Sequence, residues 1–205
     1  YRKYLFNKIK RISTNRENHM ISGLRGLEGM LKKNLIKTKY ALKPDIKWLS
    51  IDIKNIIKKN KILANYVVLL PGSSKKNPLK RWPYFRDLSK LLISKGYEVV
   101  TILGPEELEM NRSFPGHVLK NLDWPKLSGI IKNSYFVIGN DSGPSHIASC
   151  LNKKGLALFG HSTSAVRSEL ERGKFKILKV SDLNDLTADQ VFKKMTTILN
   201  KKKIN

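Results

Sequence analysis

The sequence predicts an α/β domain built around a doubly wound parallel sheet of about six strands. Two observations lead to this fold class. From residue 66 onward, short runs of β-branched and aliphatic residues recur, each with the length of a strand buried on both faces. Segments with the apolar spacing of helices separate these runs, and that alternation is typical of parallel sheets covered by helices. Because ligands bind such sheets beyond the carboxyl ends of the strands, the loops at that edge are the candidate sites.

Taken in order, the strands are expected at residues 66–70, 98–103, 117–119, 135–139, 156–159 and 175–180. Pro83 stands in the first turn of a helix that Gly96 closes, because proline suits a helix start and glycine a helix end. Thr187 and Gln190 form a capping box that opens a last amphipathic helix. The helices between these two are expected at residues 125–133 and 145–151.

The chain before the sheet has a different pattern. Apolar residues over 19–35 recur at intervals of three and four, which predicts an amphipathic helix. Pro44 interrupts the chain, and Ser50 is expected to cap a short helix over residues 51–59. The regular alternation of strands and helices begins only after residue 60, so we divide the chain there.

Composition places the chain among globular proteins with a basic surface. Its 205 residues are 40% hydrophobic, which suffices for one buried core. Lys and Arg number 40 against 16 Asp and Glu, so the formal net charge is +24. Because the lysines are scattered, compositional bias with a solvated surface explains the charge best. Docking to an anionic membrane is the next interpretation, and nucleic-acid binding is the weakest, because no DNA- or RNA-binding motif accompanies the charge.

The single cysteine and the N-terminus bear on the compartment. Cys150 lies in an apolar stretch, so we expect a small core residue in a reducing, cytoplasmic setting, without an internal disulfide. No apolar run approaches the roughly 18–20 residues of a membrane-spanning helix, and no signal peptide is recognisable. The chain begins at Tyr1, so we expect it to be part of a longer reading frame. No His, Asp and Glu residues have metal-ligand spacing, and neither a metal nor a cofactor is predicted.

The strongest motif is the loop at residues 140–146, which follows the fourth strand and opens a helix. Gly143 allows a close approach of the backbone, Pro144 suits a first helical turn, and the N–H groups of a helix start attract phosphate. Ser142 adds a hydroxyl donor. Asp141 would repel a phosphate, so it is expected to orient the loop or to accept a sugar hydroxyl. These features predict an anion site, although an ordinary helix cap has similar residues.

A second candidate loop follows the first strand. Gly72, Ser73 and Ser74 form a glycine turn with small hydroxyl residues, and Lys80 stands ahead of the next helix. This arrangement can cradle a phosphate, and the mobile charge of Lys80 could neutralise a pyrophosphate leaving group. A surface lysine without a ligand is the alternative for Lys80. Trp82 is expected in the core rather than as a stacking platform.

Other loops place an acid and two histidines at the same edge. Glu106 follows the second strand, where a carboxylate can accept hydrogen bonds from ribose hydroxyls; a partner of the helix dipole is the ordinary alternative. His146 lies one turn into the helix after the anion loop, and His161 follows the fifth strand. Both histidines are on the ligand edge, and a packing role for His146 and a plain loop role for His161 remain open.

Several segments together resemble one known family. They read P-G-S-S with K-R-W-P, L-G-P-E, G-N-D-S-G-P-S-H-I-A and A-L-F-G, in that order over about residues 66–162. These segments are similar to glycosyltransferase family 9, which comprises the ADP-heptose:lipopolysaccharide heptosyltransferases and their relatives. The resemblance implies the GT-B fold, in which two Rossmann-like domains face each other across a cleft. Residues 61–205 would then be the C-terminal nucleotide-sugar-binding domain, and residues 1–60 a helical remnant of the N-terminal acceptor domain with the linker.

By this resemblance, the candidate loops hold the sugar donor. Positions that match those around the donor's phosphates are Ser73, Ser74 and Lys80. Positions that match the helix-opening loop around the diphosphate and the sugar are Asp141, Ser142, Gly143 and His146. Glu106 matches the acid that holds the ribose, and Leu122 falls where an apolar side chain lines the nucleotide pocket.

The resemblance also implies a reaction. A sugar would be transferred with inversion and without a metal, from a nucleotide-diphosphate donor such as ADP-heptose to a lipopolysaccharide-core or related lipid-linked glycan. A general base on the absent N-terminal half would deprotonate the acceptor, and Lys80 would stabilise the departing diphosphate. We therefore expect a cytoplasmic protein, drawn to the inner face of the membrane by its charge, that binds a donor but transfers sugar poorly alone. After Gly160 the family's proline- and threonine-rich turn is replaced by residues 161–164, which leaves the donor sugar open.

Other classes of protein compete with this interpretation. A non-catalytic nucleotide-sugar-binding fragment is the first alternative, and a sugar-nucleotide epimerase of the GT-B type is the second, although no acid–base set for it is evident. A nucleic-acid-binding protein would show strongly salt-sensitive binding. A Rossmann dehydrogenase is the least favoured, because no G-x-G-x-x-G follows a strand.

Overall fold

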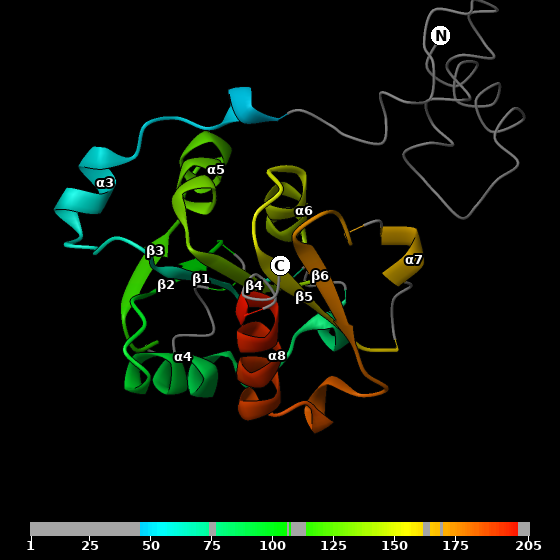
Figure 1. The fold of residues 1–205 in the computed structure, drawn as a ribbon. Helices are drawn as coiled ribbons and strands as arrows, with labels where there is room; N and C mark the ends of the chain where they lie inside the picture. Colours follow the sequence, from blue (N-terminus) through cyan, green and yellow to red (C-terminus); the bar gives the residue numbers. More distant parts are fainter. Residues whose placement is uncertain are drawn as a thin grey trace, which may run out of the picture. The chain divides into compact units, whose positions relative to one another are not determined.

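The structure is a computed structural model. A parallel sheet of six strands forms its centre (Figure 1). The structure describes residues 46–73, 77–105, 107, 114–161, 165–168 and 170–200. In spatial order the strands are β3, β2, β1, β4, β5 and β6, so the direction of winding reverses between β1 and β4. This is the strand order of the doubly wound Rossmann sheet, which binds ligands at the reversal point. The predicted fold class is confirmed.

The strands are β1 (Val67–Leu70), β2 (Val99–Leu103), β3 (His117–Lys120), β4 (Phe136–Asn140), β5 (Gly155–Phe159) and β6 (Phe175–Lys179). Every residue of the four inner strands β1, β2, β4 and β5 is buried, as the continuous apolar runs predict. The edge strands β3 and β6 are only partly buried. All six predicted strands are found, and their ends differ from the prediction by at most one residue.

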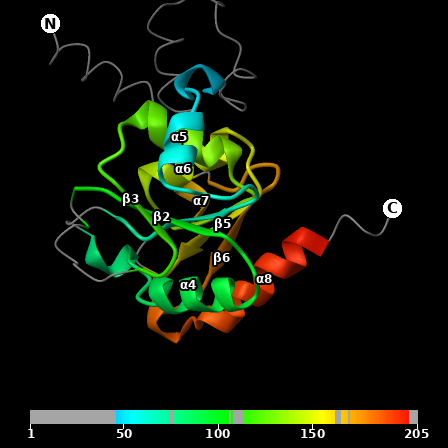
Figure 2. The same cartoon turned by 90° about the vertical axis from the view of Figure 1, so that its left-hand side faces the viewer.

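Helices cover both faces of the sheet (Figures 1 and 2). On one face lie α5 (Trp124–Asn133) and α6 (Gly143–Cys150), which contact each other. On the other face lie α4 (Phe85–Ser94) and α8 (Ala188–Asn200), whose apolar sides close the main core against β1, β2 and β4. Shorter elements are η3 (Pro78–Lys80), α7 (Ala165–Ser168) and η5 (Leu183–Asp185). The sheet is therefore covered on both sides, which leaves its carboxyl edge for a ligand.

The segment before the sheet differs from its prediction. Ile46–Thr163, which includes this segment, belongs to the same compact unit as the sheet, with η2 (Lys47–Leu49) against α5. Ser50 does not cap a helix: its Oγ lies 3.0 Å from Oγ of Ser128, and α3 (Lys54–Lys59) begins later. The carboxylate of Asp52 accepts the N–H of Lys54 instead, at 2.9 Å, which explains the later start. The helix predicted over residues 19–35 lies outside the described residues.

Predictions at two helix ends have different outcomes. The capping box of α8 is confirmed, because the N–H of Thr187 donates to Gln190 Oε1 and the N–H of Gln190 donates to Thr187 Oγ1. Gly96 follows α4 with a φ of +80°, a conformation that favours glycine. Pro83 does not stand inside α4 as predicted. It lies in a turn before the helix, which begins at Phe85.

Trp82 and Cys150 were both expected in the core. Trp82 is 2% exposed, and its indole N–H donates to the carbonyl of Leu186 at 2.7 Å, so this prediction is confirmed. Cys150 is only half-buried, at the end of α6, where Nη1 of Arg172 lies 3.9 Å from its Sγ. A position at the end of a short helix keeps part of this side chain outside the core.

Candidate functional site

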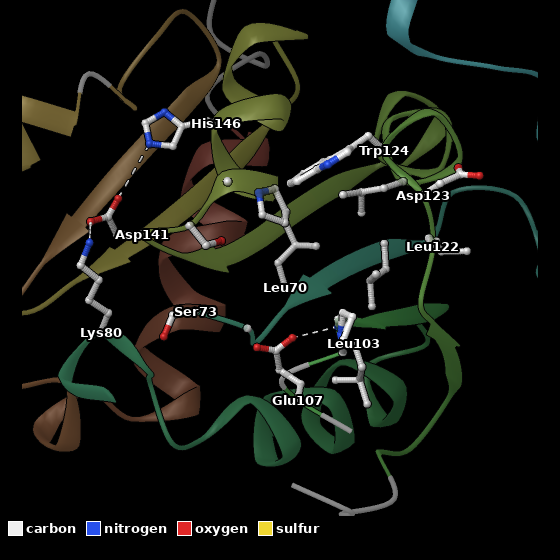
Figure 3. Close-up of a pocket in the computed structure, with 18 residues that line it drawn as sticks. Leu70, Ser73, Lys80, Leu103, Glu107, Leu122, Asp123, Trp124, Asp141 and His146 are labelled. Atoms are coloured by element: carbon white, nitrogen blue, oxygen red, sulfur yellow. Dashed lines mark hydrogen bonds and ion pairs between the residues drawn. The ribbon is translucent and has the colours of Figure 1, made fainter. Parts of the chain in front are cut away.

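A pocket of about 820 Å³ lies at the carboxyl edge of the sheet, at the reversal point between β1 and β4 (Figure 3). Its walls are the loops that follow β1, β2, β3 and β4, together with the starts of α5 and α6. One end carries charged and hydroxyl side chains, and the other is lined mainly by aliphatic and aromatic ones. A pocket of this volume, with a few polar groups in an apolar surround, suits a small organic ligand.

An ion pair dominates the polar end. Lys80 ends η3, and its Nζ lies 2.7 Å from Oδ2 of Asp141, which directly follows β4 (Figure 3). The side chains are only 22% and 10% exposed, so the pair is partly shielded from water and its attraction is stronger than on an open surface. The structure thus brings these two predicted residues together and shows what Asp141 contacts. A ligand anion that enters here would compete with Asp141 for the lysine.

The first turn of α6 is the second part of the polar end. Ser142 occupies the N-cap, and its carbonyl accepts the N–H groups of Ser145 and His146. Its hydroxyl makes no cap hydrogen bond, and this buried Oγ finds no partner among the described residues. Gly143 is exposed and lines the pocket, so a ligand can approach the backbone of the helix start. The positive end of the helix dipole therefore faces the pocket beside Lys80.

His146 lines the same end of the pocket. Its Nε2 lies 4.0 Å from Oδ1 of Asp141, and its side chain is 45% exposed. Burial in the pocket wall lowers the pKa of His146 below the ordinary 6.5; the Asp141 carboxylate opposes this effect, while Arg172 and Lys80 add to it. The ring is therefore mainly neutral at pH 7, and it can gain a proton when negative charge enters the pocket.

Asn140, which was not among the candidate residues, joins two of the loops. Its side chain is fully buried at the end of β4. The Oδ1 atom accepts the N–H of Trp82 at 3.1 Å, and the Nδ2 atom donates to the carbonyl of Pro71 at 2.8 Å. The carbonyl of Asn140 also accepts the hydroxyl of Ser145 at 2.6 Å. One residue thus positions the loop after β1 relative to the start of α6.

Arg81 is a second residue at the site for which the sequence motifs predicted no role. Its Nη2 donates to the carbonyl of Ser73 at 2.7 Å and its Nε donates to Ser73 Oγ at 3.2 Å. The same Nη2 lies 3.7 Å from Oε1 of Glu107, whose Oε2 accepts the N–H of Gly104. Ser73 is therefore held against the pocket by Arg81 rather than left mobile. In the sequence, Arg81 could have been noticed because it directly follows Lys80.

Two adjacent acids, Glu106 and Glu107, follow the end of β2. Glu106 and Ser74 lie outside the described residues, so their predicted roles stay predictions. Glu107 lines the pocket and is 7% exposed. A Cβ on Gly72 or Gly104 would lie 2.7 Å from its carboxylate group, so a side chain at either position would displace this carboxylate. The sequence shows two adjacent acids here, and the structure describes Glu107 alone.

The apolar end of the pocket lies beyond β2 and β3. Leu122, which the family resemblance assigns to the nucleotide pocket, lines this end. It is joined by Leu103 from β2 and by Leu127 and Trp124 from α5. Ionisable lining residues are few at this end, so it suits a flat, weakly polar group better than a charged one.

His161 belongs to neither end of the pocket. Its ring is exposed, and its Nδ1 lies 2.9 Å from the carbonyl of Ser181. The alternative of a plain loop histidine therefore describes it better than a ligand contact. Across the part of the chain that the structure describes, no three His, Cys, Asp or Glu side chains gather closely enough to hold a metal ion.

The sequence is similar to that of known proteins. The model of glycosyltransferase family 9 (heptosyltransferase) matches residues 2–187, which is most of the chain. The chain belongs to this family. Lipopolysaccharide heptosyltransferase 3 of Escherichia coli is 31% identical over an alignment of 108 residues, which covers 47% of this chain and 31% of that protein. A sugar-nucleotide epimerase is accordingly not favoured for this family 9 chain.

Solved structures share the fold. A family 9 glycosyltransferase from Veillonella parvula superposes with a TM-score of 0.72 at 17% identity, over 88% of this chain and 60% of that one. The heptosyltransferase WaaC of E. coli with ADP gives a TM-score of 0.65 at 20% identity, over 86% and 56%. The family 9 chain thus spans little more than half the length of these relatives. Among its described residues, no helix is both long and apolar enough to cross a membrane.

Proposed function

We propose that this chain is the donor-binding half of a heptosyltransferase-like glycosyltransferase, and that the pocket holds a nucleotide-diphosphate sugar. The observation that carries the proposal is the polarity of the pocket. A lysine, a helix start and small hydroxyl groups meet at one end, and an aliphatic and aromatic wall lies at the other. A nucleoside diphosphate has the same two-part character, with two phosphates at one end and a flat base at the other.

In this proposal each part of the donor has its place. The diphosphate lies between Lys80 and the first turn of α6, where Ser142 and Gly143 offer a hydroxyl and an approachable backbone. The base lies at the apolar end, near Leu122. The ribose falls between them, at the end of β2, where Glu106 is the acid that the family resemblance suggests. The buried carboxylate of Glu107 lines the pocket beside that position.

The same residues would assist transfer of the sugar. As the bond between sugar and diphosphate breaks, negative charge grows on the leaving phosphate. Lys80 and the start of α6 can stabilise that charge without moving far, because they already line the pocket. Once Lys80 turns to the phosphates, Asp141 is released and can accept a hydroxyl of the sugar. The general base that activates the acceptor would come from the other half of the enzyme, outside this chain.

The identities of donor and acceptor follow from the relatives rather than from the pocket. ADP-heptose is the proposed donor, because relatives are heptosyltransferases and one was solved with ADP. A lipopolysaccharide-core or related lipid-linked glycan is the proposed acceptor, in keeping with the name of the E. coli relative. We place the protein in the cytoplasm, in peripheral contact with the inner face of the membrane, because its net charge of +24 suits an anionic surface.

Nucleotide binding tests the proposal. ADP and UDP are titrated by calorimetry, without metal, into the wild type, Lys80→Ala and Lys58→Ala. Lys58 is an exposed residue of α3, so its replacement changes the net charge equally but leaves the pocket intact. We expect micromolar ADP binding that Lys80→Ala weakens by about tenfold or more and Lys58→Ala leaves unchanged. A folded wild type that binds neither nucleotide, or equal losses in the two variants, would overturn it.

A binding fragment without transfer activity is the second candidate, since the chain spans little more than half the length of its solved relatives. Release of ADP from ADP-heptose in the presence of a lipopolysaccharide-core acceptor separates the two. A chain that binds ADP but releases none from the donor above the rate without protein is a binding module by itself. Release that Lys80→Ala lowers would show that the chain also transfers.

A further inference from the structure

Trp124 is an exposed aromatic side chain at a pocket whose apolar wall includes several buried residues. It is 55% exposed, whereas its neighbour in the wall, Leu127, is 5% exposed. A large exposed ring loses favourable burial that a core position would give it. Neither the family resemblance nor the sequence motifs assign a role to Trp124. The exposure of its indole at the pocket is therefore unexplained by the site as described so far.

The phase of α5 explains why the ring faces the pocket. Trp124 is the first residue of the helix, and Leu127, Ser128 and Ile131 are its neighbours on the same side at three, four and seven residues. Those three residues are buried. Trp124 lies on the same side of α5 as these buried residues, but beyond the edge of the sheet. At that point this side of the helix lines the pocket instead of packing in the core. The carboxylate of Asp123 accepts the N–H of Lys126 and fixes this helix start.

The loop opposite holds the ring in place. A Cβ on Gly143 would lie 3.3 Å from Cη2 of the indole, so the far edge of the ring lies against the first residue of α6. In Figure 3 the Trp124 side chain reaches from α5 toward α6, and Leu103 and Glu107 lie across the pocket from it. Asp123 points away from the other labelled residues. The indole therefore spans from the apolar end to the start of the phosphate-binding end.

We propose that Trp124 is the stacking wall for the nucleobase of the donor, and thereby a residue that sets the preference among nucleotides. This inference rests on the proposed function, because it presumes a nucleotide in the pocket. Stacking on an aromatic ring recognises the face of a base, and a purine offers a larger face than a pyrimidine. Without Trp124, the base would keep only the aliphatic side of its site.

The test compares ADP with a ligand that has the diphosphate but no nucleoside. ADP and inorganic pyrophosphate are titrated into the wild type, Trp124→Ala and Trp124→Phe. We expect Trp124→Ala to weaken ADP by about five- to a hundredfold, Trp124→Phe to restore most of the affinity, and pyrophosphate binding to stay unchanged in both. The matched control is Trp48→Ala, which removes a 79% exposed indole outside the pocket and should leave ADP binding unaltered.

Fluorescence gives a second, direct signal. The chain has three tryptophans, of which Trp82 is buried in the core. In a Trp48→Phe background, ADP should quench the emission that Trp124 contributes, and pyrophosphate should not. Trp124→Ala that binds ADP like the wild type, or that loses ADP and pyrophosphate equally, would overturn the stacking role while the proposed function stands. A wild type that binds neither ligand would count against the proposed function itself.

Discussion

At the scale of residues, the contact between Lys80 and Asp141 determines how the pocket receives an anion. The two groups are 2.7 Å apart and partly shielded from water. A diphosphate must take the lysine from the carboxylate, and that carboxylate also repels the phosphates. Asp141 therefore weakens nucleotide binding in this account, although it serves the sugar later. A residue that lowers affinity for ADP and still favours transfer is a specific consequence of this geometry.

Replacing Asp141 by Asn tests that consequence. The amide keeps the size of the side chain and removes its charge, so we expect ADP to bind about two- to tenfold more tightly. Asp87→Asn on α4 is the matched control, because it removes an exposed carboxylate that also has a lysine partner. Calorimetry measures both. Weaker ADP binding by Asp141→Asn would show that the carboxylate contributes to the phosphate site rather than competing for Lys80.

His146 adds a dependence on pH. Burial lowers its pKa below 6.5 in the free protein, and a nearby diphosphate would raise it again. The protein with bound ADP then holds more protons than the free protein. The contribution of His146 to ADP affinity should therefore increase as pH falls from about 7 to 6. The folding stability of the protein without ligand depends on pH in the opposite direction. The unfolded chain takes the proton more readily than the folded one, so the contribution of His146 to the free energy of unfolding falls as pH drops below 6.5.

The comparison of two histidine variants isolates this effect from the titration of ADP itself. Calorimetry at pH 6 and pH 7, in buffers of different ionisation heat, counts the protons taken up on binding. We expect His146→Gln to lose part of the uptake and His161→Gln, whose ring lies outside the pocket, to retain it. Identical proton uptake in both variants would remove His146 from the ligand's surroundings.

At the scale of elements, Asn140 holds the loop after β1 against the end of β4. Asn140→Ala would leave the N–H of Trp82 and the carbonyl of Pro71 without their partner in a buried place. We expect this variant to lose about 2–4 kcal/mol of the free energy of unfolding. Asn133→Ala, which removes an exposed amide at the end of α5, should lose much less. Urea unfolding followed by circular dichroism measures both, and equal midpoints would contradict this role.

The elements also show which parts of the structure the sequence can predict. Continuous apolar runs indicate doubly covered strands, and the capping box marks the start of α8, because both signals depend on nearby residues. The role of Ser50 as a helix cap was wrongly predicted, since its hydroxyl bonds to Ser128, which is 78 residues away in the sequence. Local patterns contain no information about such a partner.

In the site too, features that depend on nearby residues were predicted, and features that depend on distant partners were not. The loop after β4 was found from its glycine and hydroxyl residues, and Lys80, Asp141 and His146 do meet in one pocket. No role was predicted for Arg81 or Trp124, because neither a basic residue nor a tryptophan near a helix start indicates a ligand by itself. Their importance depends on Ser73 and Gly143, which come close only in the folded chain.

At the scale of the whole molecule, the net charge of +24 predicts attraction to anionic membranes. Each lysine near such a surface contributes about 1 kcal/mol, and salt weakens the attraction. We expect the chain to sediment with vesicles that contain phosphatidylserine, to be released as salt is raised, and to ignore vesicles of phosphatidylcholine alone. Equal binding to both kinds of vesicle, or no binding at low salt, would assign the charge to the solvated surface alone.

Hydrogen exchange with and without ADP shows whether a nucleotide binds at the carboxyl edge between β1 and β4. ADP should slow amide exchange in residues 71–73, 103–105 and 141–146, and should leave residues 63–65 at the opposite edge unchanged. The protection should decrease in Lys80→Ala at the same ADP concentration. Bound ADP that protects residues 63–65, or that protects none of the three loops, would contradict the account.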